Sequence, residues 1–590
     1  MSEPIEWPED GSGAPRSPRF GDTYFSAEDG LAETRAVFLD GCGLPMAWAG
    51  RRRFAVGELG FGTGLNVLAL LDLWRRARPS PDARLLVFSI EAYPMSRVDA
   101  ATALARWPEL QALAEPLLAG WPEGRRGLRR IDWPALGATL DLAIDEAVPA
   151  LRAWTGRADA WFLDGFAPAR NPQMWRDEVL ELVATRSARG ARAASFTVAG
   201  AVRRGLEAQG FSVERVPGFG RKKQRLEARR PGAVSDMADP RIAILGAGIG
   251  GAALAAAFAR LGAEAQMFDA AGPGAGASGN PAALVTPRLD AGFGPAAELH
   301  AQAFARAVEL YEREAPEAVI ARGVLQLETA PRDAGRFDKL AGWGGFDPGA
   351  LERLDPATTA ARLGETTASG AIAYRDALVV EPQALLRAWL PNVRRRAVAR
   401  LEPDGDGWRL LDADDNLIDT ADVVVVALGH ASAPFAPVFG LRSVRGQASI
   451  AEVAFTGAPA AWGGYAIPTR TGLLFGATHD RGVADASVRA EDHARNLGFL
   501  AQGRPALAAG LTGAALDGRA GVRATTPDHL PFAGAVPGLP GLHMLTGLGG
   551  RGFMWGPLLA EALAAEILGV GGPIAEGLWR RLDPGRFESA

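Results

Sequence analysis

FAVGELGFGTGLNVLALLDLW, Phe54 to Trp74, begins as an apolar strand, passes through a glycine-rich turn and continues as an apolar helix. The turn contains three glycines, which are Gly60, Gly62 and Gly64. Glycine lets a backbone turn sharply and approach a ligand closely. A helix starting near Asn66 would direct its free N-terminal amides at the same ligand. The stretch therefore predicts an α/β unit with a ligand loop after its first strand.

The acid that precedes these glycines gives the loop a more specific character. Glu58 begins an acid-x-Gly-x-Gly-x-Gly order, which resembles the first motif of class I methyltransferases. A dinucleotide loop would instead favour Gly-x-Gly-x-x-Gly. Downstream, LLVFSIEAYP ends a second strand at Glu91, where an acid can bind ribose hydroxyls, and Asp145 is a candidate near the adenine. The alternative is an ordinary α/β loop whose glycines serve packing. We expect an S-adenosylmethionine site formed by Glu58, Gly60, Gly62, Gly64, Asn66, Glu91 and Asp145.

A further acid follows the fourth strand of this half. ADAWFLDGFAPARNPQMW, Ala158 to Trp175, leads an apolar strand directly into Asp164. An acid at this edge lies where a substrate would meet the cofactor. Asp164 could accept or orient the proton of an amine that is to be methylated. The alternative role is to cap the following turn, and we favour the catalytic one.

A second glycine loop opens the other half of the chain. RIAILGAGIGGAALAAAFARLGAEAQMFDA, Arg241 to Ala270, is a strand, a Gly-x-Gly-x-x-Gly turn, a helix and a second strand ending in Asp269. The motif glycines are Gly246, Gly248 and Gly251. Asp269 follows at about the spacing expected of a ribose-binding acid. This context predicts a dinucleotide site, which by itself does not separate FAD from NAD.

Later residues favour FAD. DVVVVALGH ends a strand at Gly429, and HMLTGLGGRGFMWGPLLAEALAAEIL places Gly549, Gly550 and Arg551 before a long helix. The amides at the start of that helix could stabilise negative charge on a reduced flavin. These features resemble the D-amino acid oxidase and glycine oxidase superfamily. The alternative is a helix that only packs on the sheet. With no cysteine after the linker, we expect noncovalent FAD.

The chain is expected to divide once. Residues 1–229 are predicted to form the methyltransferase, 230–240 a linker and 241–590 the oxidoreductase, in which an antiparallel substrate sheet lies roughly within 289–518. The predicted class is α/β, with a Rossmann-like methyltransferase followed by an FAD-binding Rossmann domain carrying the inserted sheet. Arg445 and Arg551 could provide a guanidinium for a substrate carboxylate.

Composition excludes several classes of site. There is one cysteine, Cys42, which rules out an intramolecular disulfide and thiolate zinc or iron–sulfur centres, and we expect no metal. No apolar run approaches the roughly 20 residues of a membrane span. The acidic, polar N-terminus lacks the features of a signal peptide. We expect a cytoplasmic monomer.

The charge of −5 is unevenly distributed. Between residues 186 and 230 there are 12 Lys or Arg and 3 Asp or Glu. Such a stretch can contact nucleic-acid phosphates even on an acidic protein, and the candidates are Arg221, Lys222 and Lys223. A solvated basic surface is the alternative.

Taken together, the halves resemble one family. FGDTYFSAEDGLAETRAVFLDG, ELGFGTGLN, DGFAPARNP and PGFGRKKQ, followed by an oxidase with GASGN, are similar to the bifunctional tRNA 5-methylaminomethyl-2-thiouridine biosynthesis proteins. The resemblance implies that the FAD half removes the carboxymethyl group from 5-carboxymethylaminomethyluridine, releasing glyoxylate. The other half would then methylate the exposed amine with S-adenosylmethionine. It also implies that Ser278 and Asn280 lie close to the flavin, and that the partner is tRNA, modified at its wobble uridine.

Two other hypotheses remain open at this point. One is a small-molecule amino-acid or sarcosine-type oxidase fused to an unrelated N-methyltransferase, which would not need the basic stretch. The other is an RNA-binding scaffold with inactive cofactor folds, against which the intact glycines and acids of both loops argue.

Overall fold

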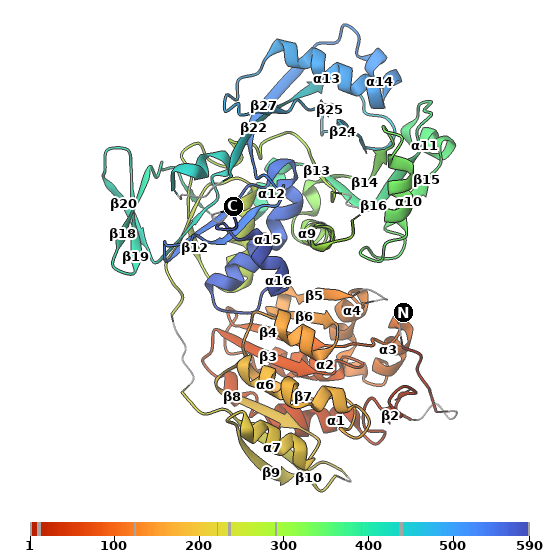
Figure 1. Cartoon of the computed structure of the whole chain (residues 1–590), viewed down its shortest axis with the longest axis vertical. Helices are drawn as coiled ribbons and strands as arrows, with labels where there is room; N and C mark the ends of the chain where they lie inside the picture. The colour runs from red at the N-terminus through yellow and green to blue at the C-terminus, as the bar shows by residue number, and fades with distance from the viewer. Residues whose placement is uncertain are drawn as a thin grey trace. The chain divides into compact units, whose positions relative to one another are not determined.

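The computed structural model describes residues 3–8, 13–122, 126–220, 222–233, 238–288, 292–390, 392–435 and 440–587. The chain forms two compact units (Figure 1). Unit 1 comprises Met1–Asp239, Arg260–Gly262 and Ala565–Gly577. Unit 2 comprises Pro240–Ala259, Ala263–Ala564 and Leu578–Ala590. In the part of the chain described, no helix is long and apolar enough to cross a membrane.

The sheet of unit 1 has the described strands in the order β5-β6-β4-β3-β7-β8-β10-β9. Its centre, from β6 to β8, is parallel, whereas β5, β10 and β9 are antiparallel to their neighbours. The strands are β3 Arg53–Leu59, β4 Arg84–Ile90, β5 Gly127–Trp133, β6 Ala138–Ile144, β7 Ala158–Leu163, β8 Ser187–Ser195, β9 Ser212–Pro217 and β10 Gln224–Arg229. The strand order reverses at β3 and β7, so a ligand crevice is expected beyond their carboxyl ends.

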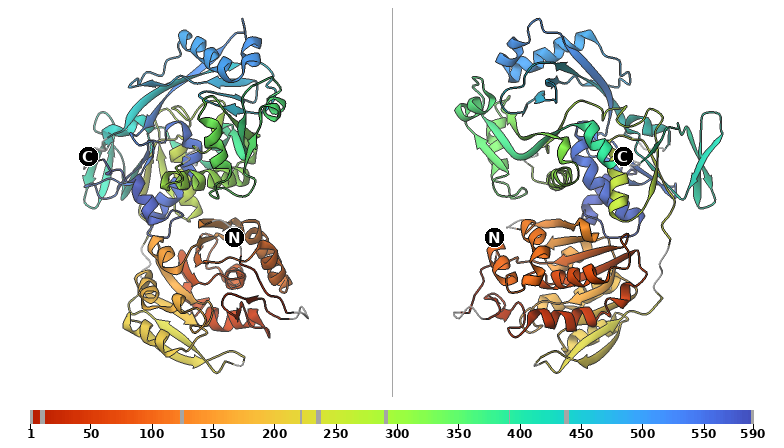
Figure 2. Two further views of the ribbon diagram at one scale, coloured as in Figure 1. Left: turned by 45° about the vertical axis from the view of Figure 1, so that its right-hand side comes forward. Right: turned by 180° about the vertical axis from the view of Figure 1, so that it is seen from behind.

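Helices cover both faces of this sheet (Figures 1 and 2). One face packs against α2 (Leu65–Ala77), α3 (Arg97–Leu104) and α4 (Gln111–Ala119). The other packs against α5 (Ala147–Ala153), α6 (Asp177–Thr185) and α7 (Gly200–Ala208). The parallel strands are apolar along almost their whole length because both of their faces are buried.

Unit 2 contains the second nucleotide-type sheet, in the order β17-β12-β11-β21-β29-β28. All pairs are parallel except β28 with β29. The strands are β11 Ile242–Leu245, β12 Ala265–Phe268, β17 Val393–Arg394, β21 Val423–Val426, β28 Phe532–Ala535 and β29 Leu542–Thr546. Helix α8 (Ile249–Arg260) follows β11, and α15 (Gly552–Ile567) follows β29. Both helices therefore begin at the carboxyl edge of this sheet.

A larger, mostly antiparallel sheet completes unit 2. Its strands are β13 Ala283–Val285, β14 Val319–Leu327, β15 Leu351–Leu354, β16 Ala371–Val380, β22 Arg442–Ala451, β23 Ala460–Ala461, β24 Tyr465–Pro468, β25 Leu473–Gly476, β26 Asp480–Arg481 and β27 Asp517–Thr525. It extends beyond the expected range of 289–518 at both ends. The strands between β16 and β22 in the sequence do not belong to this sheet. β17 and β21 are part of the nucleotide sheet, and a separate sheet is formed by β18 (Arg400–Asp404), β19 (Gly407–Leu411) and β20 (Leu417–Ala421).

A buried ion pair ties the two parts of unit 2 together. Arg306 of α9 (Pro295–Glu314) donates two hydrogen bonds, of 2.9 and 2.7 Å, to Glu561 of α15. Both side chains are 5% exposed. Removing one partner of such a pair leaves a buried charge and typically costs about 3–5 kcal/mol. The pair thus fixes α9 against the helix that ends the nucleotide sheet.

Candidate active sites

Unit 1 has a cavity of about 900 Å³ at the carboxyl ends of β3 and β7. The glycine turn, Glu91, Asp164 and the segment from Arg19 to Thr34 all contribute to its lining. Gly60, Gly62 and Gly64 have φ angles of 81°, 56° and 80°, a conformation that favours glycine. The sequence pattern predicted this turn because those angles are a local property of the chain.

Glu91 joins the end of β4 to the glycine turn. Its carboxylate accepts hydrogen bonds of 2.9 Å from the backbone nitrogens of Gly62 and Tyr93. Burial raises its pKa, and these two amides act in the opposite direction. Glu91 lines the cavity, and its remaining acceptor capacity is available to the hydroxyls of a nucleoside.

Three of the expected S-adenosylmethionine residues do not line the cavity, namely Glu58, Gly64 and Asp145. Glu58 is fully buried at the end of β3 and accepts a hydrogen bond from Ser89. Its burial raises the pKa to about 8, so it is neutral at pH 7. Asp145 accepts a hydrogen bond from the nitrogen of Glu146, and the next residues along, Glu146 to Val148, line the cavity. Their contact with the methyl donor stays a prediction.

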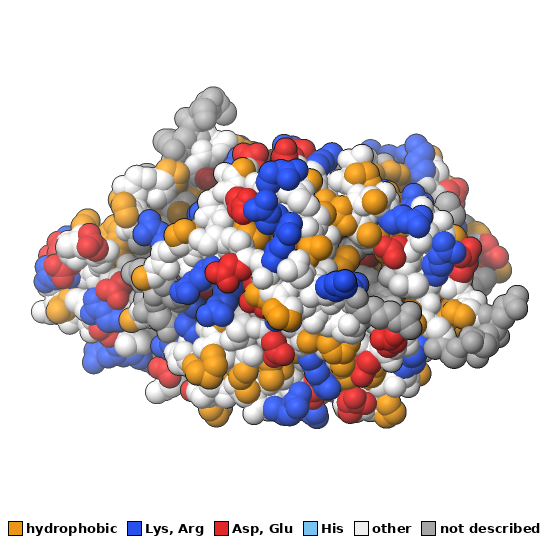
Figure 3. Space-filling model, turned by 90° about the horizontal axis from the view of Figure 1, so that it is seen from below, with side chains coloured by type: hydrophobic (Ala, Val, Ile, Leu, Met, Phe, Trp, Pro, Cys, Tyr) orange, Lys and Arg blue, Asp and Glu red, His pale blue; other side chains and the backbone are white. Residues whose placement is uncertain are grey.

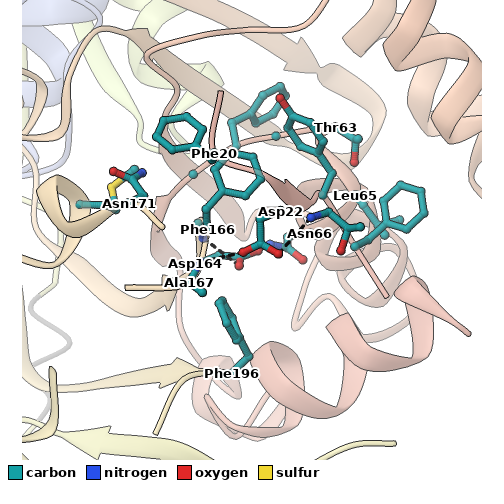
Figure 4. Close-up of a pocket in the computed structure, with 18 of the residues that line it drawn as sticks. Phe20, Asp22, Thr63, Leu65, Asn66, Asp164, Phe166, Ala167, Asn171 and Phe196 are labelled. Atoms are coloured by element: carbon teal, nitrogen blue, oxygen red, sulfur yellow. Dashed lines mark hydrogen bonds between the residues drawn. The ribbon is translucent and has the colours of Figure 1, made fainter. Parts of the chain in front are cut away.

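Asp164 and Asn66 lie side by side in the wall of the cavity (Figure 4). The side-chain nitrogen of Asn66 lies 2.8 Å from one carboxylate oxygen of Asp164, and the nitrogen of Gly165 lies 2.8 Å from the other. Burial raises the pKa of Asp164 to about 6, although the hydrogen bond from Asn66 acts to lower it. Asp164 is therefore ionised at neutral pH but titrates close to it.

Aromatic rings surround Asp164, and sequence reasoning did not single them out. Phe20 and Phe166 stack with centroids 4.7 Å apart, and the ring of Tyr24 meets Phe166 edge-on at 5.2 Å. In Figure 4, Asp164 lies between Phe166 and Phe196. Asp22 holds the arrangement by accepting a 3.0 Å hydrogen bond from the nitrogen of Ala167. Such rings provide faces on which a nucleobase can stack.

Unit 2 has a cavity of about 590 Å³ around the second glycine turn. Gly246 has a φ of 112°, and a Cβ atom there would lie 2.5 Å from the carbonyl oxygen of Ala427. A Cβ on Gly251 would lie 1.9 Å from the carbonyl oxygen of Gly246, so this glycine, which does not line the cavity, serves close packing of α8 on β11. The residues fit a dinucleotide, because Gly246 and Gly248 line the cavity without a side chain, so a ligand can approach their backbone closely.

The remaining residues expected at the flavin line the same cavity, namely Asp269, Ser278, Asn280, Gly429, Gly549, Gly550 and Arg551. Asp269 accepts hydrogen bonds from the nitrogens of Ala247 (2.8 Å) and Gly272 (2.7 Å). Ser278 accepts one from Ile249 at 3.0 Å, which anchors its loop to the start of α8. Asn280 accepts one from Arg519 at 3.2 Å. The structure thus brings these residues together, while their contact with FAD stays a prediction.

Arg445 requires a correction. Its side chain is fully buried and does not line the cavity. It pairs with Asp492 at 2.6 Å and with Asp480 at 3.3 Å. A guanidinium bound to two carboxylates inside the protein is not available to a substrate, so Arg445 stabilises the large sheet instead.

Arg523 and Tyr465 line the cavity of unit 2, whereas Arg445 does not. Both are half-buried and lie on β27 and β24 respectively. Burial raises the pKa of the Tyr465 hydroxyl, and the charge of Arg523 acts in the opposite direction. Arg551 also lines the cavity and is exposed there, although the surrounding protein lowers the pKa of its guanidinium. These side chains can receive an anionic substrate group.

The basic stretch from 186 to 230 is spread over several elements of unit 1. Arg203 pairs with Glu207, Arg225 with Glu227, and Lys222 with Glu33 at 2.8 Å. Lys222 also lines the cavity and lies 4.3 Å from the ring centre of Phe196. Lys223 is exposed, and Arg221 lies outside the described residues. Seen from the β9 and β10 end, basic side chains are interspersed with acidic ones (Figure 3).

Comparison with known proteins shows the family to which the chain belongs. A family of S-adenosyl-L-methionine-dependent methyltransferases matches residues 108–231, and one of FAD dependent oxidoreductases matches residues 241–566. The tRNA 5-methylaminomethyl-2-thiouridine biosynthesis bifunctional protein MnmC of Caulobacter sp. (strain K31) is 57% identical over 100% of this chain and 98% of its own. Its counterpart from Maricaulis maris is 43% identical over 97% and 94%. The chain belongs to this bifunctional family.

Membership confirms the predicted fold class and both cofactors. The first half is a methyltransferase that uses S-adenosylmethionine, and the second is an FAD-dependent oxidoreductase. Among solved structures, L-proline dehydrogenase from P. horikoshii is similar over 60% of this chain and 98% of its own, with a TM-score of 0.50 and 16% identity. That likeness supports only the fold of the oxidoreductase half.

Proposed function

We propose that the chain performs two successive modifications of a tRNA wobble uridine. Unit 2 removes the carboxymethyl group from 5-carboxymethylaminomethyl-(2-thio)uridine, and unit 1 methylates the resulting 5-aminomethyl group. The observation that carries this proposal is the 57% identity over the whole chain to a protein named for this biosynthesis, together with one cofactor-type cavity in each half. A free amino-acid oxidase joined to an unrelated methyltransferase would not require that full-length match.

In unit 2, bound FAD supplies the two-electron oxidation of the secondary amine. The substrate carries a carboxylate two bonds from that amine, and Arg523 can bind it through two parallel hydrogen bonds. Tyr465 adds a hydroxyl donor from the neighbouring strand. Arg551, at the start of α15, provides a further positive charge on the cavity wall. Together these groups would hold the carboxylate of the carboxymethyl arm at the cavity wall.

In unit 1, bound S-adenosylmethionine supplies the methyl group. Gly60 and Gly62 would hold its methionine end and Glu91 its ribose hydroxyls, and Asp164 would face the acceptor amine. A carboxylate there orients the amine and accepts the proton that the amine loses on methylation. The rings of Phe166 and Phe196 give the uracil a surface to stack on. Asp164 is thus the catalytic residue of this half.

The tRNA would be held by phosphate contacts outside the cavity. The exposed Lys223, next to Lys222 at the cavity wall, is suited to this because its ammonium group can reach a phosphate. Binding of this kind weakens as salt rises, since each phosphate contact releases a counterion. The proposed tRNA substrate supports a cytoplasmic location.

The proposal is tested with purified holoenzyme and tRNA bearing 5-carboxymethylaminomethyl-2-thiouridine. Nucleosides are analysed after reaction with the natural tRNA and, separately, after incubation of the enzyme with free glycine or sarcosine. Conversion of the tRNA nucleoside with no oxidation of the free amino acids supports the proposal. Rapid turnover of the free amino acids without conversion of tRNA favours the small-molecule alternative.

A further inference from the structure

We propose that Asn66 is a positioning residue for the methyl-transfer carboxylate and that Thr34 holds the Asn66 side chain in place. The inference rests on the proposed function of unit 1. The hydroxyl of Thr34 donates a 2.8 Å hydrogen bond to the side-chain oxygen of Asn66. The side-chain nitrogen of Asn66 donates a 2.8 Å hydrogen bond to Asp164. All three side chains line the cavity of unit 1.

The direction of this chain of hydrogen bonds follows from the chemistry of its members. An ionised Asp164 can only accept, so the nitrogen of Asn66 must face it. The oxygen of Asn66 then faces Thr34, whose hydroxyl rotates to donate. Thr34 and Asn66 are 5% and 7% exposed, so water does not readily replace either contact. The ionised Asp164 therefore selects the orientation of the amide, and Thr34 holds the amide in place by donating to its oxygen.

This arrangement leaves Asp164 free to act on a substrate. One of its oxygens accepts from Asn66 and the other from the nitrogen of Gly165. Each carboxylate oxygen can accept about two hydrogen bonds. One acceptor position on each oxygen thus remains for the amine. The two hydrogen bonds restrain rotation of the carboxylate and so restrict the positions from which an amine can donate to it.

The charges around Asp164 make the contact with Asn66 important for its ionisation. Burial raises the pKa of Glu58, at the end of β3, to about 8, although a hydrogen bond from Asn66 acts to lower it. Glu33, on α1 (Gly30–Thr34), raises the pKa of Asp164. Lys222 lowers it but also pairs with Glu33. Among the groups that favour the charged form, the hydrogen bond from Asn66 has the largest effect. Its loss should move the titration of Asp164 to higher pH.

A role in binding S-adenosylmethionine is the competing account of Asn66, because it lies in the first turn of α2 beside the glycine turn. The two roles predict different kinetics. A residue that only binds the methyl donor changes KM for that cofactor and leaves kcat alone. A residue that orients Asp164 changes kcat and the pH profile instead.

The test uses full-length holoenzyme, S-adenosylmethionine and tRNA bearing 5-aminomethyl-2-thiouridine. We expect Asn66→Ala to lower kcat by about tenfold or more, the usual loss for one hydrogen bond to a charged group. KM for S-adenosylmethionine should stay within about twofold. The acidic limb of the rate should move to higher pH, and further in Asn66→Asp, which adds a like charge.

Variants of Thr34 provide a second test if Asn66→Ala does not fold. Thr34→Val removes the hydroxyl at constant shape and should lower kcat and shift the acidic limb, whereas Thr34→Ser should restore both. Thr102→Val is the control, because the exposed hydroxyl of Thr102 donates to the carbonyl oxygen of Val98 within α3 and does not line the cavity of unit 1. A raised KM for S-adenosylmethionine with unchanged kcat and pH profile would overturn the inference. A wild-type protein that transfers no methyl group would defeat the proposed function itself.

Discussion

A Cβ atom on Gly246 would lie 2.5 Å from the carbonyl oxygen of Ala427, so the first glycine of the FAD turn packs directly against the strand end of β21. Gly246→Ala cannot keep its φ of 112° without strain. We expect this variant to lose bound flavin and the oxidation step, while unit 1 still methylates tRNA that already carries the 5-aminomethyl group.

Flavin absorbance and separate assays of the two steps check this prediction. Gly498→Ala is a matched control, because Gly498 lies within α13 (Ala490–Gly503) with open space around it. Loss of both activities in Gly246→Ala would indicate a general folding defect, which is contrary to the prediction.

Methyl transfer should depend on the charge of Asp164, whose pKa is raised to about 6. The carboxylate is active, so the rate should fall as pH drops through about 6 and the group becomes protonated. The substrate amine also binds a proton as pH falls, so the profile is compared with that of Asp164→Asn. This variant should be at least about 100-fold slower and lack the limb near pH 6. Asp40→Asn, which changes an exposed acid, is the control and should keep the fall in rate near pH 6. An unchanged limb in Asp164→Asn would remove Asp164 from the mechanism.

Glu58 should make unit 1 less stable as pH rises. Its pKa is about 8 in the folded chain and 4.5 as the ordinary value, so between these pH values the folded state holds a proton that the unfolded state has released. Stability then decreases with pH across this window. Glu58→Gln should reduce this loss of stability with rising pH. The measurement is the melting temperature of unit 1 at each pH, and its transition is recognised because added S-adenosylmethionine raises it. An equal decline in wild type and variant would contradict the assignment.

Arg523 should recognise the carboxylate of the first substrate. We expect Arg523→Ala to reduce kcat/KM for oxidation by about 10- to 100-fold, the loss of a charge-assisted hydrogen-bond pair, with an unchanged flavin spectrum. Arg523→Lys should retain only part of the wild-type kcat/KM, since a lysine cannot bind both carboxylate oxygens in one plane. Arg387→Ala, at an exposed arginine on α12 (Pro382–Trp389), is the control. Oxidation at the wild-type rate in Arg523→Ala would place the carboxylate elsewhere.

Features set by neighbouring residues in the chain could be predicted from sequence, and features set by packing could not. The two glycine turns, Glu91 and Asp269 follow from strand, turn and helix patterns that span about 30 residues. Arg445 was misjudged because its partners, Asp480 and Asp492, become its neighbours only when the sheet forms. The same holds for the contact between Asn66 and Asp164, which are 98 positions apart.

The direct test of the central claim is nucleoside analysis of tRNA bearing 5-carboxymethylaminomethyl-2-thiouridine after reaction with the wild-type holoenzyme. Without S-adenosylmethionine, the 5-aminomethyl nucleoside should accumulate. With it, the 5-methylaminomethyl nucleoside should form. A carboxymethylaminomethyl nucleoside that remains unchanged in both reactions, despite bound FAD, would contradict the claim that the two halves act in succession on one RNA base.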